Sequence, residues 1–158
     1  MNTELLLSSI EEAHILGILK NICSDYMQAS DKNSLRNIMA TSTDQCNTIK
    51  RIAMRKYEIE LDDQQANRLL ELVKAFLKKS EYRKRITEET REELLKKQEY
   101  KCAFCGKTID ITAHADHIVP FKYVGDELEN NLQMLCENCN EKKNDSLDYQ
   151  IRFLLKIV

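Results

Sequence analysis

Four cysteines and a few polar residues near the C-terminus have the types and spacing of groups that bind metals and activate water. They stand in three short stretches, Cys102-Ala-Phe-Cys105, Asp116-His117-Ile-Val-Pro120 and Asn131-Leu-Gln-Met-Leu-Cys136-Glu-Asn-Cys139-Asn140. Each Cys-x-x-Cys pair places two thiolates on one tight turn, and two pairs supply the four sulfurs of a closed tetrahedral zinc site. The spacing therefore predicts a structural Zn²⁺ held by Cys102, Cys105, Cys136 and Cys139.

The alternative for these cysteines is a pair of disulfides. No secretory signal is recognisable, which favours a cytoplasmic location where thiols stay reduced. Gly106 follows the first pair and suits a knuckle whose backbone turns back toward the sulfurs. A zinc ion with four sulfur ligands has no position left for water, so any chemistry must come from residues between the two pairs.

Asp116 and His117 are the residues between the pairs best suited to catalysis. The segment 107–119 alternates between apolar and polar side chains, which predicts a strand. Consecutive strand residues face opposite sides, so Asp116 and His117 are expected to act from different directions. One of them can bind a metal while the other approaches a substrate.

This arrangement resembles the HNH, or ββα-metal, endonuclease family over roughly residues 100–145. The family pattern is a zinc knuckle, Asp-His-Ile-x-Pro, an asparagine, a second cysteine pair and a final His or Asn, all of which this chain has. The resemblance implies that Asp116 and Asn140 bind a catalytic divalent cation, that His117 is the general base and that Asn131 braces the loop beside it. It also implies hydrolysis of phosphodiester bonds in DNA.

The chemistry of the side chains agrees with these implied roles. Imidazole titrates near neutrality and suits a base, while carboxylate and amide oxygens suit Mg²⁺ or Mn²⁺. Asn144 stands where some relatives have a third metal ligand. Three further residues are candidates for contact with nucleic acid, namely Lys143 at the family's basic position, Lys142 and His114.

The resemblance leaves the biological setting open, with restriction or phage defence as one expectation. The alternative to a nuclease is a zinc-stabilised module that binds nucleic acid or protein without cleaving.

The elements that position these residues follow from the rest of the sequence. The chain has 158 residues, 42% of them hydrophobic, which is enough for a core, and no apolar run reaches membrane-spanning length. Its one proline and two of its three glycines stand in the C-terminal part, so the first hundred residues are expected to be helical. We predict an α+β fold with a helical region at 1–85, an HNH module with structural zinc at 86–146 and a C-terminal helix at 147–158 that packs on the helical region.

The apolar spacing and the capping residues predict the individual elements. The expected helices are 3–29, ended by the polar run 30–34; 35–56, with a kink or a split at the polar run 41–45; a helix capped by Asp62 or Asp63; a helix capped by Thr87 or Thr90; a helix from 137 or 138 to 144; and 147–157. A second strand is expected at 132–135.

The charge distribution suggests where nucleic acid binds. The whole chain has a formal net charge of -2, but residues 74–101 contain ten basic and six acidic side chains. Because nucleic-acid binding requires phosphate neutralisation, this run is the best candidate for a DNA surface, with a solvated helix face as the alternative.

The N-terminal helix is apolar around much of its circumference, with Leu5, Leu7, Ile10, Ile15 and Leu19 on different sides. A helix of this kind must be buried on more than one side. The sequence therefore predicts that the N-terminal helices form a homodimer interface or bind a partner protein.

Overall fold

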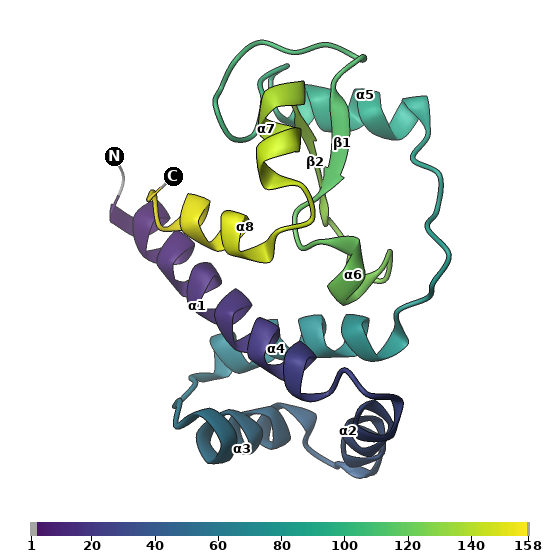
Figure 1. Ribbon diagram of the computed structural model, residues 1–158. Helices are drawn as coiled ribbons and strands as arrows, with labels where there is room; N and C mark the ends of the chain where they lie inside the picture. The colour runs from purple at the N-terminus through teal and green to yellow at the C-terminus, as the bar shows by residue number, and fades with distance from the viewer. Residues whose placement is uncertain (1–2, 158) are drawn as a thin grey trace.

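The structure is a computed structural model that describes residues 3–157. Residues 1, 2 and 158, at the outer ends of the first and last predicted regions, lie outside the described part. Four helices form the N-terminal bundle, and a small sheet with three helices forms the C-terminal module above it (Figure 1). The predicted α+β class is confirmed.

The N-terminal bundle consists of α1 (Thr3–Asp25), α2 (Ala29–Thr41), α3 (Gln45–Tyr57) and α4 (Asp63–Lys78). The predicted break at residues 30–34 is wrong, because these residues lie inside α2. The chain turns earlier, at residues 26–28. Of the two alternatives expected at 41–45, a kink or a split, the structure has the split. It is stabilised by Asp44, whose side chain accepts a hydrogen bond from the Asn47 amide at the start of α3.

Helix α4 begins with a complete capping box. The Asp62 carboxylate accepts from the Gln65 amide, and the Gln65 side chain accepts from the Asp62 amide. These bonds satisfy two amides that the helix leaves free, so the start of α4 is fixed by local chemistry. Its apolar face, from Ala66 to Leu77, is buried in the core.

Helix α1 is covered largely by its own chain. Ile15, Leu16, Ile18 and Leu19 are each at most 2% exposed, because α4 and α8 (Leu147–Leu154) pack against α1. Only its first turns remain apolar and exposed, at Leu5, Leu7 and Ile10. The burial inside the chain removes the reason for expecting a partner along most of this helix.

The C-terminal module contains α5 (Glu88–Lys97), β1 (His114–His117), α6 (Phe121–Val124), β2 (Leu132–Leu135) and α7 (Glu137–Lys143). Helix α5 is capped by Thr87. The two strands are antiparallel, with His114 opposite Leu135 and His117 opposite Leu132. Strand β2 has the predicted bounds.

The strand expected at 107–119 is wrong over its first half. The Asp110 carboxylate accepts hydrogen bonds from both the amide and the hydroxyl of Thr112, which closes a turn in place of an extended strand. Aspartate favours such turns because its short side chain competes for nearby amides. Only His114–His117 remains as a strand, and it still carries both candidate residues.

The bundle and the C-terminal module share one hydrophobic core. The largest buried cluster contains residues of the bundle together with Val119 and Val124 around α6 and Leu147 of α8. Helix α6 packs on α4, and α8 runs beside α1 (Figure 1). Within residues 3–157, no helix has both the length and the apolar character needed to cross a membrane.

Candidate active site and zinc centre

The four cysteines predicted to bind zinc come together in the structure. Cys102 and Cys105 lie on the turn after α5, while Cys136 caps α7 and Cys139 lies in its first turn. All four sulfur atoms lie within 4.8 Å of one another, and the Sγ atoms of Cys105 and Cys136 are 3.8 Å apart. Tetrahedral zinc with Zn–S bonds of about 2.3 Å requires sulfurs roughly 3.8 Å apart, so the cluster fits a structural zinc ion.

Backbone amides favour the thiolate form at one of these sulfurs. Burial raises the pKa of the Cys102 thiol, but amides of Cys105, Cys136 and Phe104 outweigh burial and lower it to about 7. The Cys136 amide donates to Cys102 Sγ at 3.4 Å. At Cys139, burial and the neighbouring sulfurs raise the pKa. A bound dication would favour the thiolate form at both cysteines, because its positive charge neutralises the sulfurs.

Gly106 forms the turn that was expected of it. Its φ of 70° lies in the left-handed region, and its amide donates to the Cys102 carbonyl at 2.9 Å. A residue without Cβ adopts this conformation at little cost. The knuckle therefore closes around the sulfur cluster.

Asp116 lies on β1 and its carboxylate is held at one oxygen. Its Oδ2 lies 2.8 Å from Lys143 Nζ and accepts a hydrogen bond from Gln133 Nε2 at 3.2 Å. Among the described residues, no hydrogen bond reaches Oδ1. The carboxylate is thus fixed through one oxygen while the other stays available.

Lys143 is a structural residue and does not fit the phosphate contact expected from the sequence. Its side chain is 0% exposed, and its Nζ donates to the His117 carbonyl at 2.8 Å as well as contacting Asp116. A fully buried ammonium cannot reach a phosphate in solution. The neighbouring Lys142 is exposed on α7 but is not one of the residues that line the cavity described below.

His117 is held by a carboxylate that the sequence analysis missed. Its Nε2 lies 2.8 Å from Asp126 Oδ1, and its ring meets Phe121 edge-on at 5.6 Å between centroids. Burial raises the pKa of Asp126, but hydrogen bonds from the Lys84 amide and from His117 outweigh burial and lower it. An ionised carboxylate only accepts, so Nε2 carries a proton, and in the neutral form of the ring Nδ1 is then the acceptor.

Asn131 braces the chain that follows β1. Its side chain is buried and bonds twice to Val119, accepting from the amide at 2.8 Å and donating to the carbonyl at 2.9 Å. Its own carbonyl accepts from the Ile118 amide at 2.8 Å. These bonds fix the backbone immediately after His117, which is the position that the resemblance implied for a bracing asparagine.

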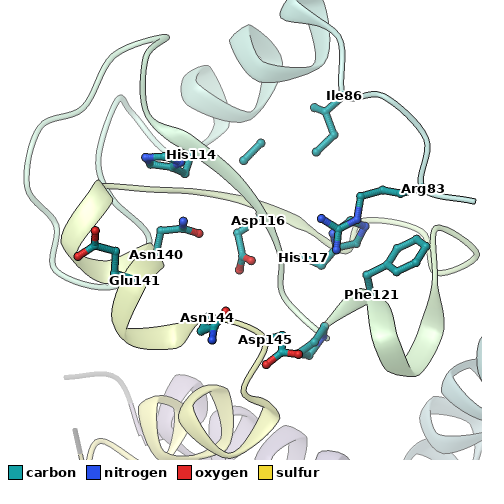
Figure 2. Close-up of a pocket in the computed structure, with 12 residues that line it drawn as sticks. Arg83, Ile86, His114, Asp116, His117, Phe121, Asn140, Glu141, Asn144 and Asp145 are labelled. Carbon is teal, nitrogen blue, oxygen red and sulfur yellow. The ribbon is translucent and has the colours of Figure 1, made fainter.

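A cavity of about 430 Å³, here called the first cavity, brings most of the predicted site residues together (Figure 2). Its polar lining consists of Arg83, His114, Asp116, His117, Asn140, Glu141, Asn144 and Asp145. Asp116 lies near the centre of this group, with Asn140 and Asn144 on the side of α7 and Arg83 beside His117 (Figure 2). No hydrogen bond holds the side chain of Asn140 or Asn144 within the described residues.

The donor atoms in the first cavity fit a magnesium-like cation. They are the free Oδ1 of Asp116 and the unbonded amide groups of Asn140 and Asn144, all of which offer hard oxygen ligands. Among the described residues, the four cysteines are the single group of three or more His, Cys, Asp or Glu side chains close enough to hold a metal. A cation in the first cavity would therefore have few protein ligands and keep several positions for water and phosphate.

Three residues of the site could not be read from the sequence motif. Asp126 lies in the loop after α6, Gln133 faces Asp116 from β2 and Arg83 belongs to the connector between α4 and α5. Arg83 is part of the basic run 74–101, which indicated a surface for nucleic acid but not a place beside His117. The other two are identified only by their contacts.

Comparison with known proteins agrees with this geometry. Residues 102–146 match the family model described as HNH endonuclease. The matched segment contains the zinc cysteines and both strands, and it is an HNH domain, which indicates a nuclease-type function. The match does not extend to the N-terminal helices, and comparisons with curated proteins and with solved structures gave no match.

Proposed function

We propose that this protein is a metal-dependent HNH endonuclease that hydrolyses phosphodiester bonds in DNA. The observation that carries the proposal is the arrangement of Asp116 and His117 at the first cavity. Asp116 keeps one carboxylate oxygen free there, while His117 is fixed by Asp126 with Nδ1 left to accept a proton.

In the proposed reaction, His117 activates the attacking water. As the water oxygen bonds to phosphorus, its proton moves to Nδ1 and the bond from phosphorus to the leaving oxygen breaks. The leaving oxygen then takes a proton from solvent. Asp126 stabilises the resulting imidazolium through the hydrogen bond at Nε2, since a carboxylate partner favours the charged ring.

The roles of the remaining residues follow from their positions. Asp116 and Asn140 would hold Mg²⁺ or Mn²⁺, which supplies positive charge next to the developing negative charge on the phosphate. Lys143 and Gln133 orient the Asp116 carboxylate, and Asn131 fixes the backbone after His117. The zinc cluster stabilises the fold around these residues and is expected to remain intact in the cytoplasm, where the thiols stay reduced.

Cleavage of supercoiled plasmid DNA tests the proposal. The zinc-loaded chain is incubated with Mg²⁺ or Mn²⁺, and we expect nicked or linear products from the wild type. His117→Ala should lower the rate by about 10²–10⁴-fold through loss of the general base. His14→Ala, a histidine exposed on α1, should cleave like the wild type.

Zinc content and circular dichroism show whether His117→Ala keeps its fold, because the His117 ring is buried. If that variant unfolds, Asp116→Asn provides a second test with a smaller change of volume. A wild-type rate in folded His117→Ala would refute the base assignment. A zinc-loaded wild type that binds DNA and never cleaves it would favour the non-cleaving module.

A further inference from the structure

The connector between α4 and α5, residues 79–87, lies against the C-terminal module beside His117. The Lys84 amide donates to Asp126 Oδ2 at 2.6 Å, and the Arg83 guanidinium lies 4.7 Å from the centroid of the Phe121 ring. Figure 2 shows Arg83 extending toward His117 and Phe121. The connector is thus attached to the same carboxylate that holds the histidine.

A second cavity, of about 310 Å³, lies on the other side of His117. It shares His117 and Ile86 with the first cavity, so the two cavities meet at the histidine. Its basic lining comes from Lys84 and Arg85 of the connector and Lys97 of α5. All three lie outside the segment that matches the HNH family model.

The two cavities differ in charge. The first has one arginine and three carboxylates, those of Asp116, Glu141 and Asp145, which suits a cation. The second has three basic side chains and two carboxylates, those of Glu93 and Asp126. Asp126 already accepts hydrogen bonds at both oxygens, from His117 and from the Lys84 amide.

The basic side chains of the second cavity are available to a ligand. Arg85 and Lys97 are exposed, and neither forms a hydrogen bond or ion pair with any residue in the described part of the chain. Unpaired cations beside a concave surface bind phosphates because they release condensed counterions from the nucleic acid. Contacts of this kind position a strand without reading its sequence.

We propose that the second cavity binds a phosphate of the DNA strand next to the one being cleaved. The strand would run from the first cavity across His117 and onto Arg85 and Lys97, so the connector and α5 supply part of the substrate site. This inference rests on the proposed nuclease function and adds to the substrate site basic residues that lie outside the segment matching the HNH family model.

The test is the salt dependence of DNA binding, which does not require cleavage. Fluorescence anisotropy with a labelled DNA duplex, in Ca²⁺ and a series of NaCl concentrations, gives the slope of log K against log salt. Arg85→Gln/Lys97→Gln should reduce this slope by about 1, because the loss of one phosphate contact removes about one unit. In Mg²⁺, the same variant should show a raised KM and a smaller change in kcat.

Arg55→Gln/Lys107→Gln is the matched control. It removes two exposed basic side chains, on α3 and beside the knuckle, that line neither cavity. Its slope and KM should equal those of the wild type.

The outcomes separate this inference from the proposed function. A wild type that cleaves, with an unchanged slope in Arg85→Gln/Lys97→Gln, would overturn the second cavity as a phosphate site and leave the nuclease function standing. A reduced slope in a chain that never cleaves would support the site and refute the nuclease function. If Arg85→Gln/Lys97→Gln reduced the slope for single-stranded RNA and left the slope for DNA unchanged, the assignment to DNA would be overturned.

Discussion

Replacing Lys143 with methionine tests the buried contacts that hold Asp116 and the backbone of His117. The Lys143 side chain is 0% exposed, and its Nζ lies 2.8 Å from both Asp116 Oδ2 and the His117 carbonyl. Methionine fills a similar volume and removes the charge. Breaking a buried ion pair from one side costs about 3–5 kcal/mol, because it leaves an uncompensated charge.

The expected loss of stability in Lys143→Met depends on how exposed the Asp116 side chain is. The Asp116 side chain is 16% exposed and keeps its bond to Gln133, so the lower end, about 3 kcal/mol, applies. The lost bond to the His117 carbonyl adds about 1 kcal/mol. In a chain of this size the total corresponds to a fall in Tm of roughly 10 °C.

Urea and thermal unfolding with saturating zinc measure the effect. Lys142→Met, an exposed neighbour on α7, should change the free energy of unfolding by less than about 0.5 kcal/mol. Adding Asp116→Asn to Lys143→Met should restore part of the stability, since no lone carboxylate then remains. A Lys143→Met protein with full zinc content that melts within about 2 °C of the wild type would refute the reasoning.

Two further substitutions test the zinc cluster and the asparagine brace. Cys139→Ser should abolish zinc binding and unfold the C-terminal module, because structural zinc contributes on the order of 10 kcal/mol to folding; elemental analysis and circular dichroism measure both effects, and a folded, reduced protein without zinc would contradict the prediction. Asn131→Ala leaves the Val119 amide and carbonyl without their buried partner, and should cost about 3 kcal/mol in urea unfolding and lower the cleavage rate. Unchanged stability in that variant would show that water replaces the side chain.

The zinc cluster, strand β2 and the start of α4 were predictable because their chemistry is local. Cysteines two residues apart, alternating side chains over Leu132–Leu135 and the pair Asp62 and Gln65 each specify a structure within a few residues. One local pattern also led to a wrong prediction. Residues 107–113 alternate like a strand, but the Asp110 carboxylate closes a turn that the alternation does not reveal.

Asp126 and the burial of Lys143 could not be predicted because both depend on contacts between distant segments. Asp126 follows α6 in the chain and contacts His117, which precedes it. Lys143 lies in the last turn of α7 and contacts the His117 carbonyl on β1. The sequence gives each residue a plausible surface role. Only the folded arrangement reveals that one holds the histidine and the other holds the aspartate.

The N-terminal helices take part in the site through the connector that follows α4. Asp126 accepts hydrogen bonds from His117 at one oxygen and from the Lys84 amide at the other, so any movement of the connector alters the carboxylate that holds the histidine. The connector itself is placed by close packing, since a Cβ on Gly125 would lie 3.0 Å from Cγ of Lys79. Helix α6, which precedes this glycine, packs on α4. The bundle therefore holds the connector whose Lys84 amide bonds to the carboxylate beside His117, and under the proposal above it also places Arg85 at the second cavity.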